Sequence, residues 1–284
     1  SAGVESSLAT VPGVPGTWNV SVNARTCVWP SAPKVSTVYS VPGQKASTMT
    51  RLLFEAAKAK RAASGHSAAA STLLTPRLPA DRAPSEEEMD QLRRALLEPV
   101  GRAAFTTARH LAIEARALQV DERKLSATLL GAAVRRAGPG MLVAAYWIGD
   151  GALALFNPES ADLQLLGDAD SGEYSGQTRF LALSEFAGDT WDNIKKRYRC
   201  VWVPSGYRLV LMTDGVSAPK FGTEVRMRDA AVWSAWWASD LAPQVNLQAD
   251  HTHAAEELER YLGFWSQGEH DDRTLAIVGI NHVH

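Results

Sequence analysis

Cysteine is scarce in this sequence: its 284 residues include 2, Cys27 and Cys200. Two thiols supply neither a disulfide framework nor the ligand set of a zinc cluster. We expect both cysteines to be buried or incidental. Because disulfide-rich chains belong to oxidising compartments, so little cysteine favours a reducing cytoplasm as the location of the protein.

Long apolar runs and a strong net charge are also missing. The longest apolar candidate, Met141–Ile148, is far shorter than the ~20 residues of a transmembrane helix. The N-terminus lacks the charged and apolar regions that make up a signal peptide. The formal net charge is -2, which gives no general reason to expect nucleic acid or an anionic membrane as a partner. We therefore predict that the protein binds neither.

What the sequence does contain is typical of a globular protein, with 45% hydrophobic and 21% charged residues. A chain of this length can bury a large core, in one large domain or two small ones. Residues 1–17 are rich in Ser, Gly, Pro and Val, which predicts a flexible N-terminal arm. Small residues and prolines near residues 64–84 predict a mobile loop.

Hydrophobic periodicity predicts a mixture of helices and strands. The expected strands are Trp18–Val22, Val35–Val41, Ser126–Val134, Met141–Tyr146, Ala152–Phe156, Val201–Pro204, Leu209–Met212 and Leu275–Ile280. The expected helices are Met49–Ala63, Ala230–Leu241, Ala254–Phe264, and one with a Ser85/Glu88 capping box that is interrupted at Pro99 and resumes through Leu118. Long helices between hairpin-connected strands indicate an α+β layered domain instead of alternating βαβ units.

Aspartates occur where expected strands begin or end. Leu209–Met212 runs into Asp214, Leu142–Ile148 runs into Asp150, and Asp271 stands just before the last strand. Carboxylates at the mouth of a sheet can converge on one hard cation, because their oxygens suit Mg²⁺ and Mn²⁺. An Asp-Gly pair at a strand end is also an ordinary turn, so each aspartate taken alone is a weak signal.

Four segments in a fixed order make the signal more specific. They are Ser126-Ala127-Thr128, Ile148–Gly151, Met212–Ser217 and Gly263–Ile277. In turn they resemble the small-Thr strand, the Val-Gly-Asp-Ser corner, the Asp-Gly-(apolar)-Ser/Trp-Asp motif and the terminal Asp-Asn/Asp-x-Thr strand of one family. That family is the metal-dependent protein phosphatases of type 2C, in their compact bacterial form. The likeness covers residues 120–280 and, more faintly, residues 18–60.

This resemblance implies a fold: a central β-sandwich flanked by helices, in a single domain over residues 18–284. It implies two divalent ions, Mn²⁺ or Mg²⁺, which lower the pKa of a shared water for attack on a phosphoserine or phosphothreonine of a protein. Asp214 and Asp271 are the implied ligands of one metal. Asp150 is an acid near the metals, bound through water or holding a third ion. Arg25 is the implied phosphate-binding arginine, because a guanidinium grips phosphate bidentately.

The sequence departs from the family where the chemistry needs acids. The aspartate expected to bridge both ions is replaced by Pro42, and a further expected acid is replaced by Ala218. No aspartate precedes Asp81, and the earlier acids are Glu5 and Glu55. Without a bridging carboxylate, the repulsion between two dications is poorly offset. The sequence therefore predicts one metal or none, unless another carboxylate takes that place.

Two functions stay open at this point. One is an active phosphatase with a phosphoprotein substrate. The other is a catalytically silent pseudophosphatase that binds a kinase, a phosphoprotein or an assembly partner. An unrelated metal hydrolase is a third and weaker hypothesis. Residues Asp168–Gln177 are expected to form either a flap beside the site or an ordinary surface loop, and Asp272 is placed to substitute for Asp271. The tryptophans at positions 233, 236 and 237 are expected to pack in the core.

Overall fold

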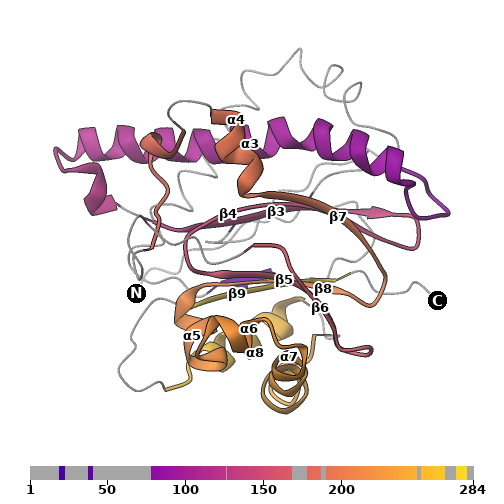
Figure 1. The fold of residues 1–284 in the computed structure, drawn as a ribbon. Helices are drawn as coiled ribbons and strands as arrows, with labels where there is room; N and C mark the ends of the chain where they lie inside the picture. The colour runs from indigo at the N-terminus through magenta and orange to yellow at the C-terminus, as the bar shows by residue number, and fades with distance from the viewer. Residues whose placement is uncertain are drawn as a thin grey trace.

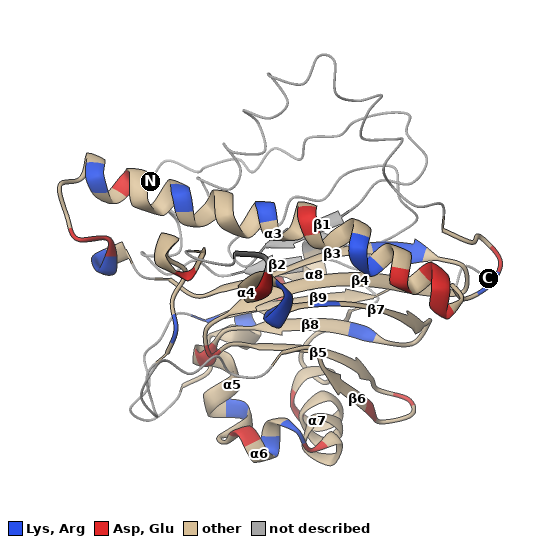
Figure 2. Cartoon of the chain, turned by 45° about the horizontal axis from the view of Figure 1, so that its top comes forward, with Lys and Arg blue, Asp and Glu red and all other residues tan. Residues whose placement is uncertain are grey.

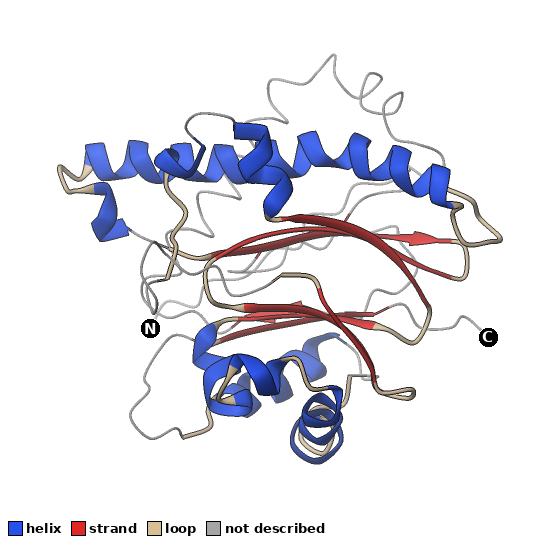
Figure 3. Cartoon of the chain, in the orientation of Figure 1, coloured by secondary structure: helices blue, strands red, loops and turns tan. Residues whose placement is uncertain are grey.

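Two antiparallel sheets stack face to face, with helices on both outer faces (Figures 1 and 3). The architecture comes from a computed structural model that describes residues 19–22, 38–40, 78–125, 127–167, 178–186, 190–247, 251–265 and 273–279. The layer order of helix, sheet, sheet and helix confirms the predicted α+β sandwich. The Lys, Arg, Asp and Glu residues lie mainly on the helices and loops that surround the strands (Figure 2).

The first sheet has the order β1-β3-β4-β7. Its strands are β1 (Asn19–Val22), β3 (Leu129–Ala137), β4 (Gly140–Ile148) and β7 (Tyr198–Pro204). The second sheet has the order β2-β9-β8-β5-β6. Its strands are β2 (Val38–Ser40), β9 (Thr274–Gly279), β8 (Arg208–Met212), β5 (Ala152–Asn157) and β6 (Asp162–Leu165). The sequence prediction missed β6, which is not among the expected strands.

Alternating side chains of both sheets fill the space between them, as the two-residue period of a strand requires. The inward-facing set includes Leu130, Val134, Val143, Trp147, Leu153, Leu155, Leu209, Leu211 and Val278. Both β4 and β9 are buried along their whole length, because each is covered by the other sheet on one face and by helices on the other. Their sequences are therefore continuously apolar, which is why they were recognisable as strands.

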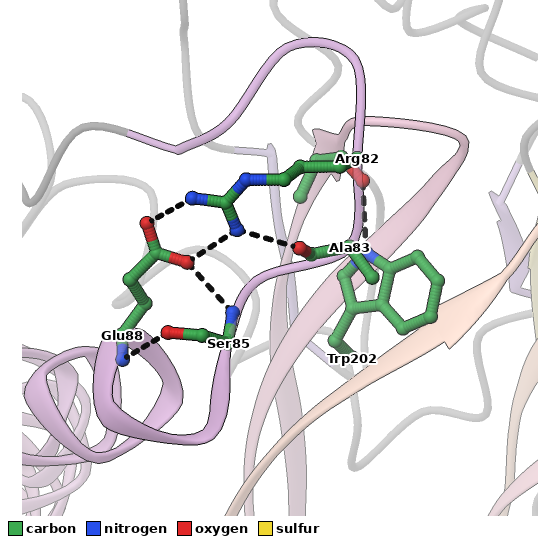
Figure 4. Close-up of polar contacts among 6 residues, drawn as sticks. Arg82, Ala83, Ser85, Glu88 and Trp202 are labelled. Atoms are coloured by element: carbon green, nitrogen blue, oxygen red, sulfur yellow. Dashed lines mark hydrogen bonds and ion pairs between the residues drawn. The ribbon is translucent and has the colours of Figure 1, made fainter.

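The outer face of the first sheet is covered by α3 (Glu86–Ala117) and the shorter α4 (Thr190–Lys196) (Figure 1). The predicted capping box is confirmed: the Glu88 amide donates to Ser85 Oγ at 3.3 Å, and the Ser85 amide donates to Glu88 Oε2 at 2.6 Å (Figure 4). The predicted interruption at Pro99 is wrong, because α3 runs straight through it. Buried residues continue on one face from Leu96 to Ala104, and this packing offsets the backbone hydrogen bond that a proline removes.

The outer face of the second sheet is covered by the later helices (Figure 1). They are α5 (Asp214–Phe221), α6 (Glu224–Met227), α7 (Ala230–Ala235), a π-helical turn (Trp236–Leu241) and α8 (His251–Leu262). The tryptophan prediction is confirmed in that Trp233 and Trp236 are buried in the core beneath this sheet, and Trp237 packs against it. In the part of the chain that the structure describes, no helix has both the length and the apolar character to cross a bilayer.

Several predicted features lie outside the described residues. These are the N-terminal arm, the helix Met49–Ala63, residues 64–77 of the predicted loop and the predicted flap Asp168–Gln177. The remaining part of that loop, residues 78–84, bends at residues 80–82 and leads into α3. Cys200 is buried, as expected. Burial raises the pKa of its thiol to about 11, so it is protonated and unreactive near neutral pH.

Candidate functional site

A three-residue corner carries the chain from the first sheet to the second at one end of the sandwich (Figure 1). Gly149 has φ +114°, and a Cβ there would meet Thr128 Cγ2 at 2.3 Å. A Cβ at Gly151 would meet the Met212 carbonyl oxygen at 2.7 Å. The glycines are required because the corner is this tight. Between them Asp150 is half-buried.

The chain reaches the same end of the sandwich again where β8 leads into α5. Asp214 is the first residue of α5, and its Oδ1 accepts a hydrogen bond from the Gly215 amide at 2.9 Å. The sequence predicts a strand followed by a turn here. The structure instead has a helix there, and Gly215 is buried within its first turn. Asp214 itself is half-buried.

Strand register brings Asp150 and Asp214 to neighbouring positions. In the antiparallel pair of β5 and β8, Ala152 stands opposite Met212. Asp150 precedes Ala152 by two residues and Asp214 follows Met212 by two residues. Both carboxylates therefore extend beyond the same rung of the sheet, on adjacent chain segments.

The beginning of β9 and the end of β2 lie at this end as well. Leu275 stands opposite Met212, and Thr274 stands opposite Ser40. The predicted ligand Asp271, its neighbour Asp272 and the predicted bridging position Pro42 lie outside the described residues, so their roles stay predictions. The end of β1 lies near the start of β3 at the matching end of the first sheet, since Val22 stands opposite Gly131. Arg25, three residues further, also lies outside the described residues.

One residue at the site was missed by the sequence analysis. Thr178 Oγ1 donates a hydrogen bond to Asp150 Oδ2 at 2.5 Å. It is the first described residue after the predicted flap. A threonine in a polar stretch carries no sequence signal for such a contact.

One glutamate in the segment that follows Thr178 contacts two arginine side chains. The Glu185 carboxylate accepts from Arg197 Nη2 at 3.1 Å and lies 3.4 Å from Arg179 Nη1. The Arg197 side chain is 12% exposed and the Glu185 side chain 19%. Because the ion pair of Arg197 and Glu185 is largely removed from water, its geometry is held more firmly than that of a surface ion pair. These contacts join Glu185 to Arg179, which is next to Thr178, and to Arg197, which directly follows α4.

The donor chemistry of the described site suits a hard cation, since Asp150 and Asp214 offer carboxylate oxygens. These two are fewer than a complete ligand set. Among the described residues, no group of three or more His, Cys, Asp or Glu side chains is arranged to hold a metal ion. Ala218 lies on α5, one turn after Asp214, and it brings no carboxylate. The predicted ligand Asp271 lies beyond the described residues.

Comparison with known proteins gives one family. A family model described as "Protein phosphatase 2C" matches residues 49–263. A search of curated proteins found no match. Similar solved structures include the serine-threonine phosphatase 2C of Toxoplasma gondii, with 13% identity, TM-score 0.46, and coverage of 94% of this chain and 95% of that one. Another is the Mycobacterium tuberculosis serine/threonine phosphatase PstP/Ppp, with 14% identity, TM-score 0.39, and coverage of 93% and 99%.

Proposed function

The chain belongs to the protein phosphatase 2C family, and from this premise we propose that it hydrolyses phosphoserine or phosphothreonine in a protein substrate. The observation that carries the proposal is the register at one end of the second sheet. Asp150 and Asp214 lie beyond the same rung, beside the beginning of β9. Carboxylates at a strand mouth suit a divalent metal, because such ions prefer oxygen ligands.

The residues proposed to hold Mn²⁺ or Mg²⁺ are Asp214 and Asp271, with Asp150 binding through water or holding a further ion. When bound, such ions lower the pKa of a water and stabilise charge on the phosphate oxygens. The chain's own contribution is positioning. The Thr178 hydroxyl orients the Asp150 carboxylate, and the Gly215 amide orients that of Asp214. Arg25 is proposed to bind the substrate phosphate through its planar guanidinium.

A catalytically silent binding module is the second candidate, and a specific observation favours it. The expected acidic positions hold Pro42 and Ala218. Ala218 lies on α5 close in sequence to Asp214, and the described part of the site offers no third carboxylate in its place. If the missing acids are not replaced from elsewhere in the chain, two dications cannot be held close together, because their repulsion is poorly offset. In that case the fold serves to bind a kinase or a phosphoprotein.

Metal-dependent hydrolysis separates the two candidates. The purified protein is assayed with an aryl phosphate and with a phosphothreonine peptide, in Mn²⁺ and in EDTA. We expect turnover that requires Mn²⁺ and is lost in Asp214→Asn. The matched control is Asp81→Asn, which removes an exposed aspartate near the β3–β4 turn at the far end of the sandwich. Equal rates in Mn²⁺ and EDTA from folded protein would reject the enzyme and support the binding module.

A further inference from the structure

One face of α3 is exposed along the helix. The residues on it follow one another at steps of three or four positions, which places them on one side of an α-helix. We call this set the α3 stripe, and all of its members are exposed: Glu87, Gln91, Arg94, Glu98, Arg102, Phe105, Arg109, Ile113 and Arg116. Another face of the helix packs on the first sheet, so the stripe lies on the outer surface of the sandwich.

The two halves of the α3 stripe differ in chemistry. Its first half, from Glu87 to Glu98, is polar throughout. In its second half arginines stand at positions 102, 109 and 116, and the side chains of Phe105 and Ile113 lie between them. Phe105 is 39% exposed and Ile113 is 50% exposed. Figure 2 shows the acidic residues concentrated at the start of α3 and the basic residues spaced along its remainder. The second half is therefore both basic and partly apolar.

The second half of the stripe carries positive charge that the described residues do not balance. Arg102 forms an ion pair with Glu98, one turn earlier on the helix. Among the described residues, neither Arg109 nor Arg116 has a side-chain hydrogen bond or an ion pair. These two guanidinium groups are exposed on one helix face, so they attract the carboxylates of a binding partner.

The apolar side chains between these arginines are placed as anchors. Phe105 packs edge-on against the buried Phe186, with ring centres 5.7 Å apart, so the orientation of its ring is set before any partner binds. Ile113 lies further along the same helix face. A single exposed apolar residue is ordinary on a protein surface. Two on one face, each between arginines, make the mixed apolar and charged surface on which another helix packs.

This half of the stripe lies at the same end of the sandwich as the candidate site. Beneath it, Ala108 and Leu111 pack in one cluster with Leu129 and Ile148. Leu129 begins β3 and stands opposite Ile148, which ends β4. The corner that carries Asp150 follows directly, and Figure 1 shows the C-terminal part of α3 above this corner. A protein bound to the second half of the stripe is therefore placed beside the candidate site.

Three occupants fit the second half of the stripe poorly. Residues 1–77 contain Glu5 and Glu55 as their acids, outnumbered by lysines and arginines, so this segment has the same sign of charge as the stripe. The first half of the stripe on a second copy offers acids but no apolar side chain to cover Phe105 and Ile113. A membrane surface needs a broader apolar face than two side chains provide. Charge complementarity thus favours a partner that presents carboxylates and apolar side chains together.

We propose that the second half of the α3 stripe is a docking surface for a partner protein, which binds it through an acidic amphipathic helix. Carboxylates of that helix pair with Arg109 and Arg116, and its apolar side chains cover Phe105 and Ile113. Helices commonly bind in this way, through anchors at steps of three and four residues. The inference goes beyond the proposed function, because docking on α3 needs neither metal nor turnover. It applies equally to an active phosphatase and to a silent binding module.

Fluorescence anisotropy with a labelled synthetic peptide tests the inference. The probe is a peptide of ~20 residues, above the length at which isolated helices are marginal, built of Ala, Gln, Leu and Glu with every Leu and Glu on one face. The wild type should bind it. The double variant Arg109→Gln/Arg116→Gln should bind it ~5-fold more weakly and with less dependence on salt, because exposed ion pairs are modest and screened. Ile113→Gln should also bind it ~5-fold more weakly, because less apolar area is buried.

Two controls are matched to these variants. Arg94→Gln removes an exposed arginine from the first half of the same stripe, and it should bind the peptide as the wild type does. A peptide of the same composition, with Leu and Glu scattered over all faces, should bind the wild type much more weakly than the probe does. Circular dichroism verifies that each variant is folded, as expected for changes at exposed positions.

Three outcomes would overturn the inference. The first is a folded wild type that does not bind the peptide, as expected if the acids of Asp168–Gln177 occupy the stripe. The second is equal affinity of the wild type, the double arginine variant and Ile113→Gln. The third is binding to vesicles of phosphatidylserine and phosphatidylcholine, lost in the same variants, without binding to the peptide. Phosphatase activity is assayed separately, and a wild type that binds the peptide but hydrolyses nothing rejects the proposed function alone.

Discussion

Thr213 and Thr274 are joined by two hydrogen bonds across β8 and β9. The Thr213 amide donates to the Thr274 carbonyl at 3.0 Å, and the Thr274 amide donates to Thr213 Oγ1 at 2.9 Å. Thr213 is the N-cap of α5, yet within the described residues its hydroxyl makes no capping bond. The hydroxyl that usually stabilises a helix start is used across the sheet instead. The start of α5, and with it Asp214, is thereby tied to the start of β9.

Replacing Thr213 by valine should therefore destabilise the protein. Valine keeps the shape but offers no acceptor, and Thr274 is buried, so its amide loses its partner where water does not reach it easily. We expect a loss of ~1–3 kcal/mol in the free energy of unfolding, the usual cost of an unsatisfied buried group. Urea denaturation measures it, with Thr213→Ser as the control that keeps the hydroxyl. A valine variant as stable as the serine variant would contradict this explanation.

Thr178 should affect metal dependence more than stability. Its hydroxyl donates to Asp150, so Thr178→Val leaves that carboxylate without the group that orients it. If the proposed function holds, Mn²⁺-dependent turnover should require ~10-fold more Mn²⁺, the effect typical of an outer-shell partner. Thr178→Ser keeps the donor and should behave as the wild type does. The measurement is the Mn²⁺ concentration that gives half-maximal rate, and an unchanged value in the valine variant would exclude this role.

The sandwich was predictable from sequence because its strands are buried and strongly apolar. The structure has strands at the two apolar runs Leu142–Ile148 and Leu209–Met212, and a tight corner at the glycines that follow the first run. The prediction failed at Pro99, where local propensity indicated a break. Packing of α3 along the first sheet outweighed the one lost hydrogen bond. Local helix propensity fails in this way where buried residues before and after a proline favour one continuous helix.

The contacts that position the site could not be predicted from sequence. Thr178 and Asp150 are 28 residues apart, and Thr213 and Thr274 are 61 apart. Neither pair forms a motif, because any residue with a hydroxyl and the right location would serve. The ring of Phe264 is similar, since Lys220 and Arg273 reach it from two other segments of the chain. A sequence shows the carboxylates at strand ends, but the groups that hold them are set by the tertiary fold.

The corner at Gly149 should tolerate a side chain less well than another glycine with positive φ. Gly222 has φ +77°, and a Cβ there would meet no described atom within 4 Å, whereas a Cβ at Gly149 would collide with Thr128. Gly222→Ala should therefore cost only the conformational strain of ~1–2 kcal/mol. Gly149→Ala should cost a further ~1–3 kcal/mol because it also overpacks the corner. Thermal and urea denaturation of both variants measure the difference, and equal losses would mean that the corner relaxes freely.

The contact between Arg82 and Glu88 should make stability depend on pH in the acid range. Arg82 grips both Glu88 oxygens, at 2.7 Å and 2.8 Å (Figure 4). These bonds, with that from the Ser85 amide, lower the pKa of Glu88 from 4.5 to about 2. A carboxylate with a lowered pKa in the folded state stabilises it above the unfolded pKa, and this contribution is lost as pH falls through the folded value. The stabilisation should thus be complete at pH 6 and decline from about pH 4.5 toward pH 2.

The measurement is the difference in the free energy of unfolding between wild type and Glu88→Gln at several pH values. Glutamine cannot ionise, so the advantage of the wild type should shrink as the medium becomes more acidic. Glu87→Gln is the matched control: Glu87 is an exposed glutamate in the same first turn of α3. A wild-type advantage over Glu88→Gln that stays constant from pH 6 to pH 3 would show that the Arg82 contact does not persist in solution.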